Sequence, residues 1–178
     1  MNNMTSYFGG NSLKRHFSYP FYISEEKRLR KIGINADFKF YLSFFNFKNL
    51  KSKFVLDVGT DPASPEYFIK NKAGNVVVSR DDTSKLITES VFNGNIISLN
   101  DAKNMRADVL KFDYSPKTKM LFDSINLSAY NEWIVVFNKN EIDGYDYEVK
   151  TRLMRDLGGT KIGSKDNEVI VWGKIDKE

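Results

Sequence analysis

The sequence predicts an α/β fold with a doubly wound, mostly parallel sheet, a C-terminal antiparallel hairpin and an N-terminal helical extension. Two observations lead to this prediction. From Phe54 onward, short apolar runs alternate with polar or helical segments, and the runs read FVLDVG, VVVS, NIISL, ADVLKF and WIVVF. Such alternation is typical of parallel strands covered by helices on both faces. Near the C-terminus, TKIG and EVIVWG flank the turn sequence SKDN, which predicts an antiparallel pair at the sheet edge.

Cap residues predict where the helices between these strands begin and end. Ser64, followed by Pro65 at the first helical position, predicts a helix start after the first strand. Asp82 or Thr83 is expected to cap the next helix, which should stop at Gly94. A further helix is predicted before the WIVVF strand, and residues 143–159 after it predict a helix closed by two glycines.

The N-terminal third precedes this alternating pattern. Residues 1 to about 23 predict an irregular arm, because they carry two adjacent glycines and a proline without clear periodicity. Ser24 and the two acids after it predict a helix that ends at Gly33. Residues 36–49 predict a second helix with a wide aromatic face.

Length and composition favour one domain. The chain has 178 residues, of which 41% are apolar, and this suffices for a single buried core. We therefore expect residues 1–178 to form one domain. Within it, residues 1–51 would be a basic, aromatic arm with helices, and residues 52–178 would be the α/β core.

The residue types exclude several kinds of chemistry and location. Without cysteine there is no disulfide framework, thiolate metal site or cysteine nucleophile, and the lone histidine, His16, excludes a His-pair metal site. We expect no metal. No apolar stretch approaches the roughly 20 residues that a membrane helix needs, and MNNMTSYFGG lacks the pattern of a signal peptide. A soluble, cytoplasmic protein without membrane association is expected.

Positive charge is concentrated in the N-terminal third. Residues 1–53 hold ten Lys or Arg against three acids, hence +7, whereas the remainder holds 17 against 20, hence −3. Aromatic residues crowd the same region. Basic and aromatic side chains together can hold nucleic acid or an anionic ligand. The other interpretation is a helical cover whose aromatics pack on the core while its lysines face water.

Acidic residues stand at the ends of three predicted strands. The first strand ends in Asp57-Val58-Gly59, where the glycine allows a sharp turn before a helix. Asp81 follows the second strand, and Asp101 with Ala102 follows the third. In a doubly wound sheet, ligands bind at the carboxyl ends of the strands. The sequence therefore predicts a ligand site at this edge, although each acid alone could be a helix cap.

These residues carry a family resemblance. VLDVG, Asp81 and Asn100-Asp101-Ala102 resemble the first three motifs of class I S-adenosylmethionine-dependent methyltransferases. The segment 108–113, DVLKFD, is similar to the fourth strand of the FkbM-like branch. The resemblance covers about residues 52–174 and implies a Rossmann-like fold with S-adenosylmethionine as cofactor.

The resemblance also implies roles for individual residues. Asp57 and Gly59 would shape the loop around the methionine part of the cofactor. Asp81 would bind the ribose hydroxyls, although Arg80 stands between it and the strand. Asp101 would accept from the adenine amino group, with the Ala102 backbone beside it.

The glycine loop departs from the family pattern. Asp61, which would also lie at the cofactor, stands where the family usually keeps a second glycine, and Pro62 offers no amide hydrogen. Ser115 and Pro116 replace the Glu-Gly pair after the fourth strand. The loop is thus a degenerate form of the family's loop.

The reaction needs alignment of methyl donor and acceptor, and a hydroxyl acceptor also needs a base. The resemblance places Asp113 at the tip of the fourth strand, facing donor and acceptor. Candidate bases are Asp113, Tyr114 and His16, in that order. Lys111 and Asp113 leave the same face of a strand, so a structural pair between them is the alternative.

Three functions remain open at this stage. The first is O-methylation of a hydroxyl on a small molecule or glycan. The second is an RNA-directed methyltransferase that holds nucleic acid through the basic N-terminal region. The third is a non-catalytic protein that retains the methyltransferase fold.

Overall fold

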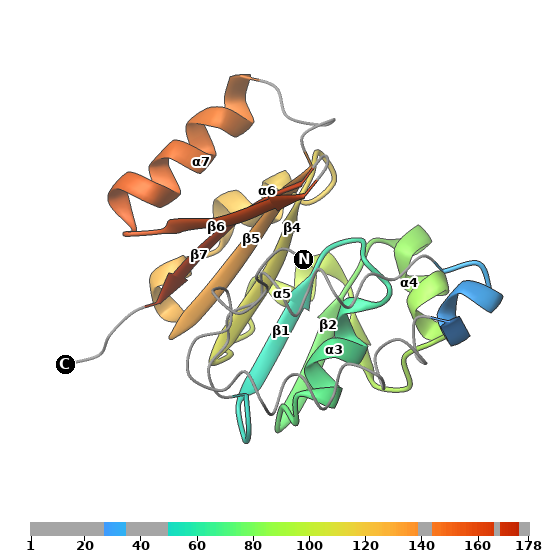
Figure 1. The fold of residues 1–178 in the computed structure, drawn as a ribbon. Helices are drawn as coiled ribbons and strands as arrows, with labels where there is room; N and C mark the ends of the chain where they lie inside the picture. Colours follow the sequence, from blue (N-terminus) through green and yellow to red (C-terminus); the bar gives the residue numbers. More distant parts are fainter. Residues whose placement is uncertain (1–26, 35–49, 139–143, 166–167, 175–178) are drawn as a thin grey trace, which may run out of the picture. The chain divides into compact units, whose positions relative to one another are not determined.

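The computed structural model describes residues 27–34, 50–138, 144–165 and 168–174 (Figure 1). The chain divides into two compact units, residues 1–46 and 47–178. In the first unit, residues 27–31 form a helix, and Gly33 lies in the turn directly after it, which agrees with the prediction that this glycine ends the helix; its φ is 82°, which glycine adopts readily. Ser24 and the helix predicted over 36–49 lie outside the described residues. That the whole chain is one domain stays a prediction.

A seven-stranded sheet in the order β3-β2-β1-β4-β5-β7-β6 organises the second unit (Figure 1). Its parallel strands are β1 Phe54–Val58, β2 Asn75–Ser79, β3 Asn95–Ile97, β4 Val109–Tyr114 and β5 Glu132–Asn138. β7 Glu168–Lys174 pairs antiparallel with β5, and β6 Thr160–Lys165 pairs antiparallel with β7. The predicted mostly parallel sheet and C-terminal hairpin are confirmed.

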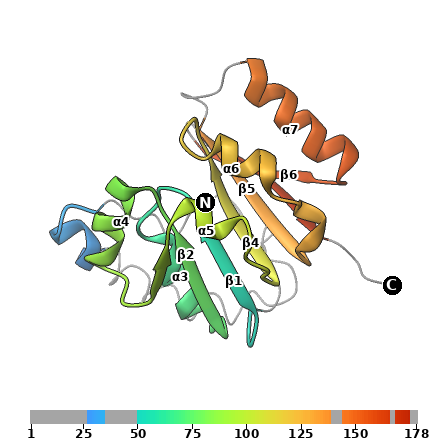
Figure 2. The ribbon, with the colours of Figure 1, turned by 180° about the vertical axis from the view of Figure 1, so that it is seen from behind.

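Helices cover both faces of this sheet. They are α3 Ser64–Lys70, α4 Asp82–Glu89, α5 Leu99–Ala102, α6 Lys119–Ser124 and α7 Gly144–Asp156, with a 3₁₀ turn at Leu127–Ala129. Seen from behind, α5, α6 and α7 lie on the face opposite α3 (Figure 2). Within the described ranges, no helix is long and apolar enough to cross a membrane.

Three helix-boundary predictions were wrong. Ala63 is the N-cap of α3, because the hydroxyl of Ser64 bonds Asp57 instead of a helix amide. Asp81 caps α4, since its Oδ1 accepts the amides of Thr83 and Ser84. α4 ends at Glu89, well before the predicted stop, and the short α5 was not predicted.

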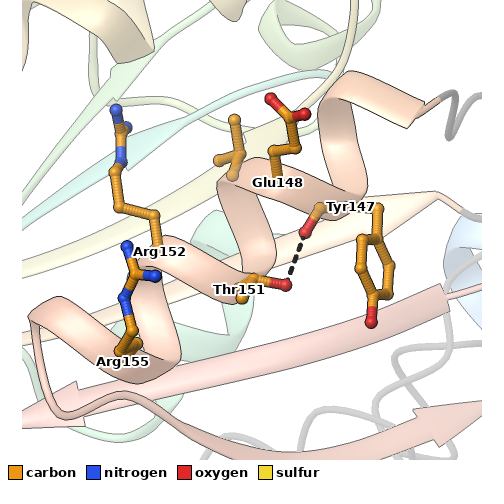
Figure 3. A pocket seen from close by; sticks show the side chains of 6 residues that line it. Tyr147, Glu148, Thr151, Arg152 and Arg155 are labelled. Carbon is orange, nitrogen blue, oxygen red and sulfur yellow. Dashed lines mark hydrogen bonds between the residues drawn. The ribbon is translucent and has the colours of Figure 1, made fainter.

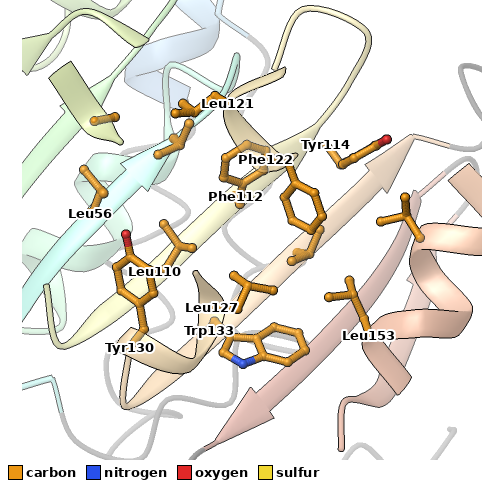
Figure 4. Packing of buried hydrophobic residues seen from close by; sticks show 14 of the residues in the cluster. Leu56, Leu110, Phe112, Tyr114, Leu121, Phe122, Leu127, Tyr130, Trp133 and Leu153 are labelled. Atoms are coloured by element: carbon orange, nitrogen blue, oxygen red, sulfur yellow. The ribbon is translucent and has the colours of Figure 1, made fainter. Parts of the chain in front are cut away.

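Alternation along the strands separates an apolar face from a polar one. Leu110 and Phe112 of β4 share a face with Trp133 of β5, and all three are buried against α6 and α7, as Figure 4 shows. Asp57 of β1 and Lys111 of β4 sit at the intervening positions, on the side of α3. The period of two residues therefore gathers the polar side chains of β1 and β4 on the α3 face.

Candidate functional site

The turn after β1 requires glycine. We call residues 59–63 the Gly59 loop. Gly59 is buried and has a φ of 145°, which residues other than glycine rarely adopt. A Cβ atom on Gly59 would overlap the carboxylate of Asp113 from β4. The missing side chain thus makes room for another part of the protein.

Asp57 is the most completely enclosed acid of this region. Its side chain has 0% exposure, and Nη2 of Arg80 lies 3.1 Å from its Oδ2. Nζ of Lys111 lies 3.3 Å from its Oδ1, because the register of β1 and β4 places these two residues side by side. The hydroxyl of Ser64 donates to Oδ2. Both carboxylate oxygens therefore have cationic partners.

Arg80 directly follows β2 and turns inward. Its side chain is fully buried, and Nη1 donates to the backbone oxygens of Asp57 at 2.8 Å and Ser79 at 3.1 Å. Nη2 donates to the carbonyl of Asp61 at 2.6 Å. A single guanidinium thus joins the ends of β1 and β2 to the Gly59 loop. Because the side chain of Arg80 points into the protein, Asp81 is still the acid at the carboxyl end of β2.

Asp113 completes what we call the buried ion cluster, which consists of Asp57, Arg80, Lys111 and Asp113. Nζ of Lys111 lies 2.6 Å from Oδ2 of Asp113, so the structural pair that was the alternative to a site role is present on one strand face. The same oxygen accepts the backbone amides of Thr60 at 3.2 Å and Asp61 at 3.3 Å. The carboxylate from β4 thereby binds two amides of the Gly59 loop.

The charges in the cluster stabilise one another against burial. Burial alone would raise the pKa of Asp57, but Arg80 and Lys111, with hydrogen bonds from Ser64 and Arg80, bring this pKa below its ordinary value of 3.8. Asp57 therefore contributes stability above about pH 3.9, the pKa of unfolded Asp, and this stability is lost as the pH falls through its folded pKa.

The pKa values of Lys111 and Asp61 are both raised, but for different reasons. Burial would lower the pKa of Lys111, but the carboxylates of Asp113, Asp57 and Asp61 hold it above 10.5. Its contribution to stability is present below about pH 10.4 and is lost as the pH rises through its folded pKa. Burial raises the pKa of half-buried Asp61 above 3.8, and Asp113 adds to this rise against the effect of Lys111.

Asp81 stands at the carboxyl end of β2 but is already engaged. Besides the two helix amides, Oδ2 accepts the hydroxyl of Ser84 at 2.9 Å. Nζ of Lys117, from the loop after β4, lies 3.6 Å from Oδ1. Hydrogen bonds from Ser84 and Thr83 and the charge of Lys117 lower the pKa of Asp81 despite the opposing effect of burial. Asp81 is ionised at neutral pH and holds the start of α4.

Asp101 and Ala102 follow β3, in α5. Asp101 is exposed, and its Oδ2 accepts the hydroxyl of Ser98 at 2.7 Å. Ala102 is fully buried. The structure thus brings the predicted acids to the ends of three adjacent strands. Asp57 is enclosed, Asp81 caps a helix, and Asp101 faces solvent.

Tyr114 does not meet Asp113. The two are consecutive in β4 and leave opposite faces of the sheet, and Tyr114 is buried against Phe122 and Phe137, with ring centres 5.1 and 5.2 Å away. His16 lies outside the described residues. In the described part of the chain, no group of three or more potential metal ligands is found.

Sequence reasoning missed Arg80 and Ser64 as partners of Asp57. One signal was present, because charged residues at positions 57, 80 and 111 adjoin or interrupt strongly apolar runs. Charges in such positions are seldom buried unless they are paired. The strand register, which decides who pairs with whom, could not be read from the runs themselves.

A separate hollow of about 450 Å³ lies along α7. Figure 3 shows its lining, with Tyr147, Thr151 and Arg155 on successive turns of that helix. The hydroxyl of Thr151 donates to the carbonyl of Tyr147 at 2.9 Å. None of the predicted site residues belongs to α7. The hollow is therefore not part of the strand-end site.

Arg80→Met tests whether the buried ion cluster holds this edge together. Methionine keeps an unbranched apolar side chain but removes the guanidinium, which leaves Asp57 buried with Lys111 as its remaining cation. We expect the free energy of unfolding, measured by urea denaturation at neutral pH, to fall by about 3–5 kcal/mol. The matched control is Lys117→Met, whose side chain is 61% exposed in its pair with Asp81. That control should lose less than about 1 kcal/mol, and equal losses would contradict the account.

Asp61→Asn tests the raised pKa of Asp61. Asparagine can still accept the amide of Ala63, as Oδ1 of Asp61 does at 2.8 Å, but it carries no charge. Ionised Asp61 disfavours the folded state above its folded pKa, so the variant should be the more stable protein at pH 7. The difference should shrink as the pH falls toward the pKa of unfolded Asp, about 3.9. Urea denaturation across pH 4–8 measures it, and a difference independent of pH would contradict the prediction.

Comparison with known proteins defines the fold. Neither the models of known families nor the curated proteins contain a match. A solved structure from Thermoplasma acidophilum aligns with a TM-score of 0.57 at 14% identity, over 84% of this chain and 94% of that chain. A proposed S-adenosylmethionine-dependent methyltransferase from Streptococcus mutans gives 0.55 at 10% identity, over 77% and 48%. A proposed methyltransferase from Pseudomonas syringae gives 0.52 at 10%, over 75% and 94%. These similarities confirm the predicted Rossmann-like fold.

Proposed function

We propose that the chain is an S-adenosylmethionine-dependent methyltransferase that binds its cofactor at the carboxyl ends of β1, β2 and β3. The observation that carries this proposal is the meeting of the Gly59 turn, Asp81 and Asp101 at the ends of three adjacent parallel strands. The two proposed methyltransferases that share the fold support it. The FkbM-like branch is part of the proposal and rests on the sequence of β4.

The residues at β2 and β3 fit the adenosine part of the cofactor. Exposed Asp101 would accept from the adenine amino group, beside the backbone of Ala102. Oδ2 of Asp81 accepts the hydroxyl of Ser84, and a carboxylate oxygen can accept a second hydrogen bond, here from a ribose hydroxyl. Asp81 would thus bind ribose while it continues to cap α4.

The methionine part does not fit the Gly59 loop as it is arranged. The amides of Thr60 and Asp61 already donate to Asp113, and Pro62 has no amide hydrogen. Asp57 faces Arg80 and Lys111, so its role near the amino group of the cofactor would require a rearrangement. As it is arranged, the site therefore fits the adenosine part of the cofactor and not its methionine part.

When bound, S-adenosylmethionine supplies a methyl group that is already activated. The protein then has to orient donor and acceptor, and good orientation contributes roughly 7–11 kcal/mol. A hydroxyl acceptor also needs a base. Asp113 is the described candidate closest to the Gly59 loop, whereas Tyr114 is buried on the other face of β4.

For the acceptor, we propose a hydroxyl of a small molecule or glycan, with RNA as the second candidate. The observation that supports RNA as a candidate is the charge of +7 in residues 1–53, since phosphates are bound through Lys and Arg. A cytoplasmic location is proposed with either acceptor.

A non-catalytic protein that retains the fold is the alternative to both. The observation that favours it is the buried ion cluster, which fills the space at Gly59 with the protein's own carboxylate.

Cofactor binding tests the main proposal. S-Adenosylhomocysteine should raise the melting temperature in a dose-dependent manner, whereas NAD and GTP should not. Asp101→Ala should weaken binding about tenfold or more, because it removes a hydrogen bond of about 1.4 kcal/mol or more. The control is Asp156→Ala, which removes an exposed acid from α7. No shift with S-adenosylhomocysteine would refute the proposal and favour the non-catalytic alternative.

Salt dependence separates the acceptors. If RNA is bound, its affinity should fall steeply between roughly 50 and 200 mM salt, because phosphate contacts release counterions. Binding of a neutral small acceptor should hardly change. Fluorescence anisotropy with a labelled RNA oligonucleotide measures the first case, and an RNA affinity that does not respond to salt would exclude the second candidate.

A further inference from the structure

The carboxylate of Asp113 lies against the Gly59 loop, and the role inferred for it here rests on the proposed function. Two consecutive backbone amides, those of Thr60 and Asp61, point at one oxygen of this side chain. Consecutive amides in a turn form a concavity that binds anions. In this structure the anion that they bind is a carboxylate, and it belongs to the protein itself.

The same carboxylate fills the space that Gly59 leaves open. A Cβ atom on Gly59 would fall within the Asp113 side chain, so the two cannot share the position. Any ligand that approaches the backbone at Gly59 meets the same obstacle. The internal carboxylate and a ligand group on the loop amides are therefore mutually exclusive.

Asp113 is held unevenly. Its contact with Nζ of Lys111 is 2.6 Å, whereas the two amide bonds measure 3.2 and 3.3 Å, at the long end of the range for N–H···O bonds. Its side chain is 15% exposed, whereas those of Asp57, Arg80 and Lys111 are at most 1% exposed. Within the cluster, Asp113 is the member that can turn toward solvent without opening the others.

Its departure would leave Asp57 as the partner of both cations. Lys111 retains Asp57 at 3.3 Å, and Asp57 retains Arg80 at 3.1 Å. The Gly59 loop remains fastened from below, because Arg80 donates to the carbonyl of Asp61 at 2.6 Å. The two loop amides would then face an open position while the loop keeps its shape.

We propose that Asp113 is an internal competitor for the Gly59 loop, which a ligand carboxylate, such as that of the methionine part of the cofactor, must displace in order to bind. The resemblance to the methyltransferases implies a residue that assists donor and acceptor. The geometry assigns this carboxylate an opposing effect on cofactor affinity. The open state is a fraction of the population, and the apparent affinity for a carboxylate ligand is reduced by that fraction.

The experiment compares two probes by isothermal titration calorimetry. S-Adenosylhomocysteine carries the amino-acid carboxylate, whereas 5′-methylthioadenosine has the same adenosine and sulfur but lacks it. Asp113→Ala should tighten binding of S-adenosylhomocysteine about tenfold or more and leave methylthioadenosine within about twofold of wild type. Asp113→Asn, which keeps the shape and removes the charge, should give a smaller gain in the same direction and guards against a folding defect in the alanine variant.

The outcomes separate this inference from the proposed function. If wild type binds S-adenosylhomocysteine and both variants bind it equally or more weakly, the inference is wrong and the proposed function stands. Equal gains for the two probes would also overturn the inference, because the gain would not depend on the ligand carboxylate. If wild type and both well-folded variants, checked by circular dichroism, bind neither probe, the proposed function fails and the inference falls with it.

Discussion

The burial of Asp57 is the constraint on which this edge of the sheet depends. An isolated carboxylate inside a protein is strongly unfavourable, and the structure offsets that penalty with Arg80 and Lys111 at 3.1 and 3.3 Å. Each partner extends the constraint. Arg80 fixes the Gly59 loop through backbone carbonyls, and Lys111 positions Asp113 over the loop amides. One buried charge thereby determines the geometry at the ends of β1, β2 and β4.

The two-residue period of the strands places the polar side chains on one face of the sheet and the apolar side chains on the other. Positions 57, 111 and 113 face α3, and position 114 faces the apolar cluster with Phe122. A shift of one residue in the register of β4 would bury Asp113 among aromatics and expose Tyr114 to the ion cluster. Fold and site therefore depend on the same pairing of β1 with β4, and changes to the buried charges affect stability and ligand binding together.

The sequence was a good guide to the elements and a poor guide to their side-chain partners. Alternating apolar runs predicted the parallel strands and the hairpin, and the spacing of Lys111 and Asp113 indicated a structural pair as one of two alternatives. The prediction of Ser64 as the cap of α3 was wrong because the Ser64 hydroxyl donates to Asp57 instead, and this bond depends on a tertiary contact. The family resemblance placed an acid at each strand end but could not reveal that Arg80 is buried beside Asp57 or that Asp113 occupies the amides of the Gly59 loop. The roles proposed for Asp57, Gly59, Asp61, Asp81, Asp101, Ala102, Asp113 and Tyr114 stay predictions.

An internal carboxylate, held by the ion cluster, occupies the amides of the Gly59 loop. Amide hydrogen exchange at Thr60 and Asp61 tests it directly, because Thr60 is exposed and owes its protection to the bond with Asp113. Both amides should exchange slowly in wild type, and Thr60 should exchange near the unprotected rate in Asp113→Ala. Unprotected amides in wild type, or protection that survives the loss of the Asp113 carboxylate, would contradict it.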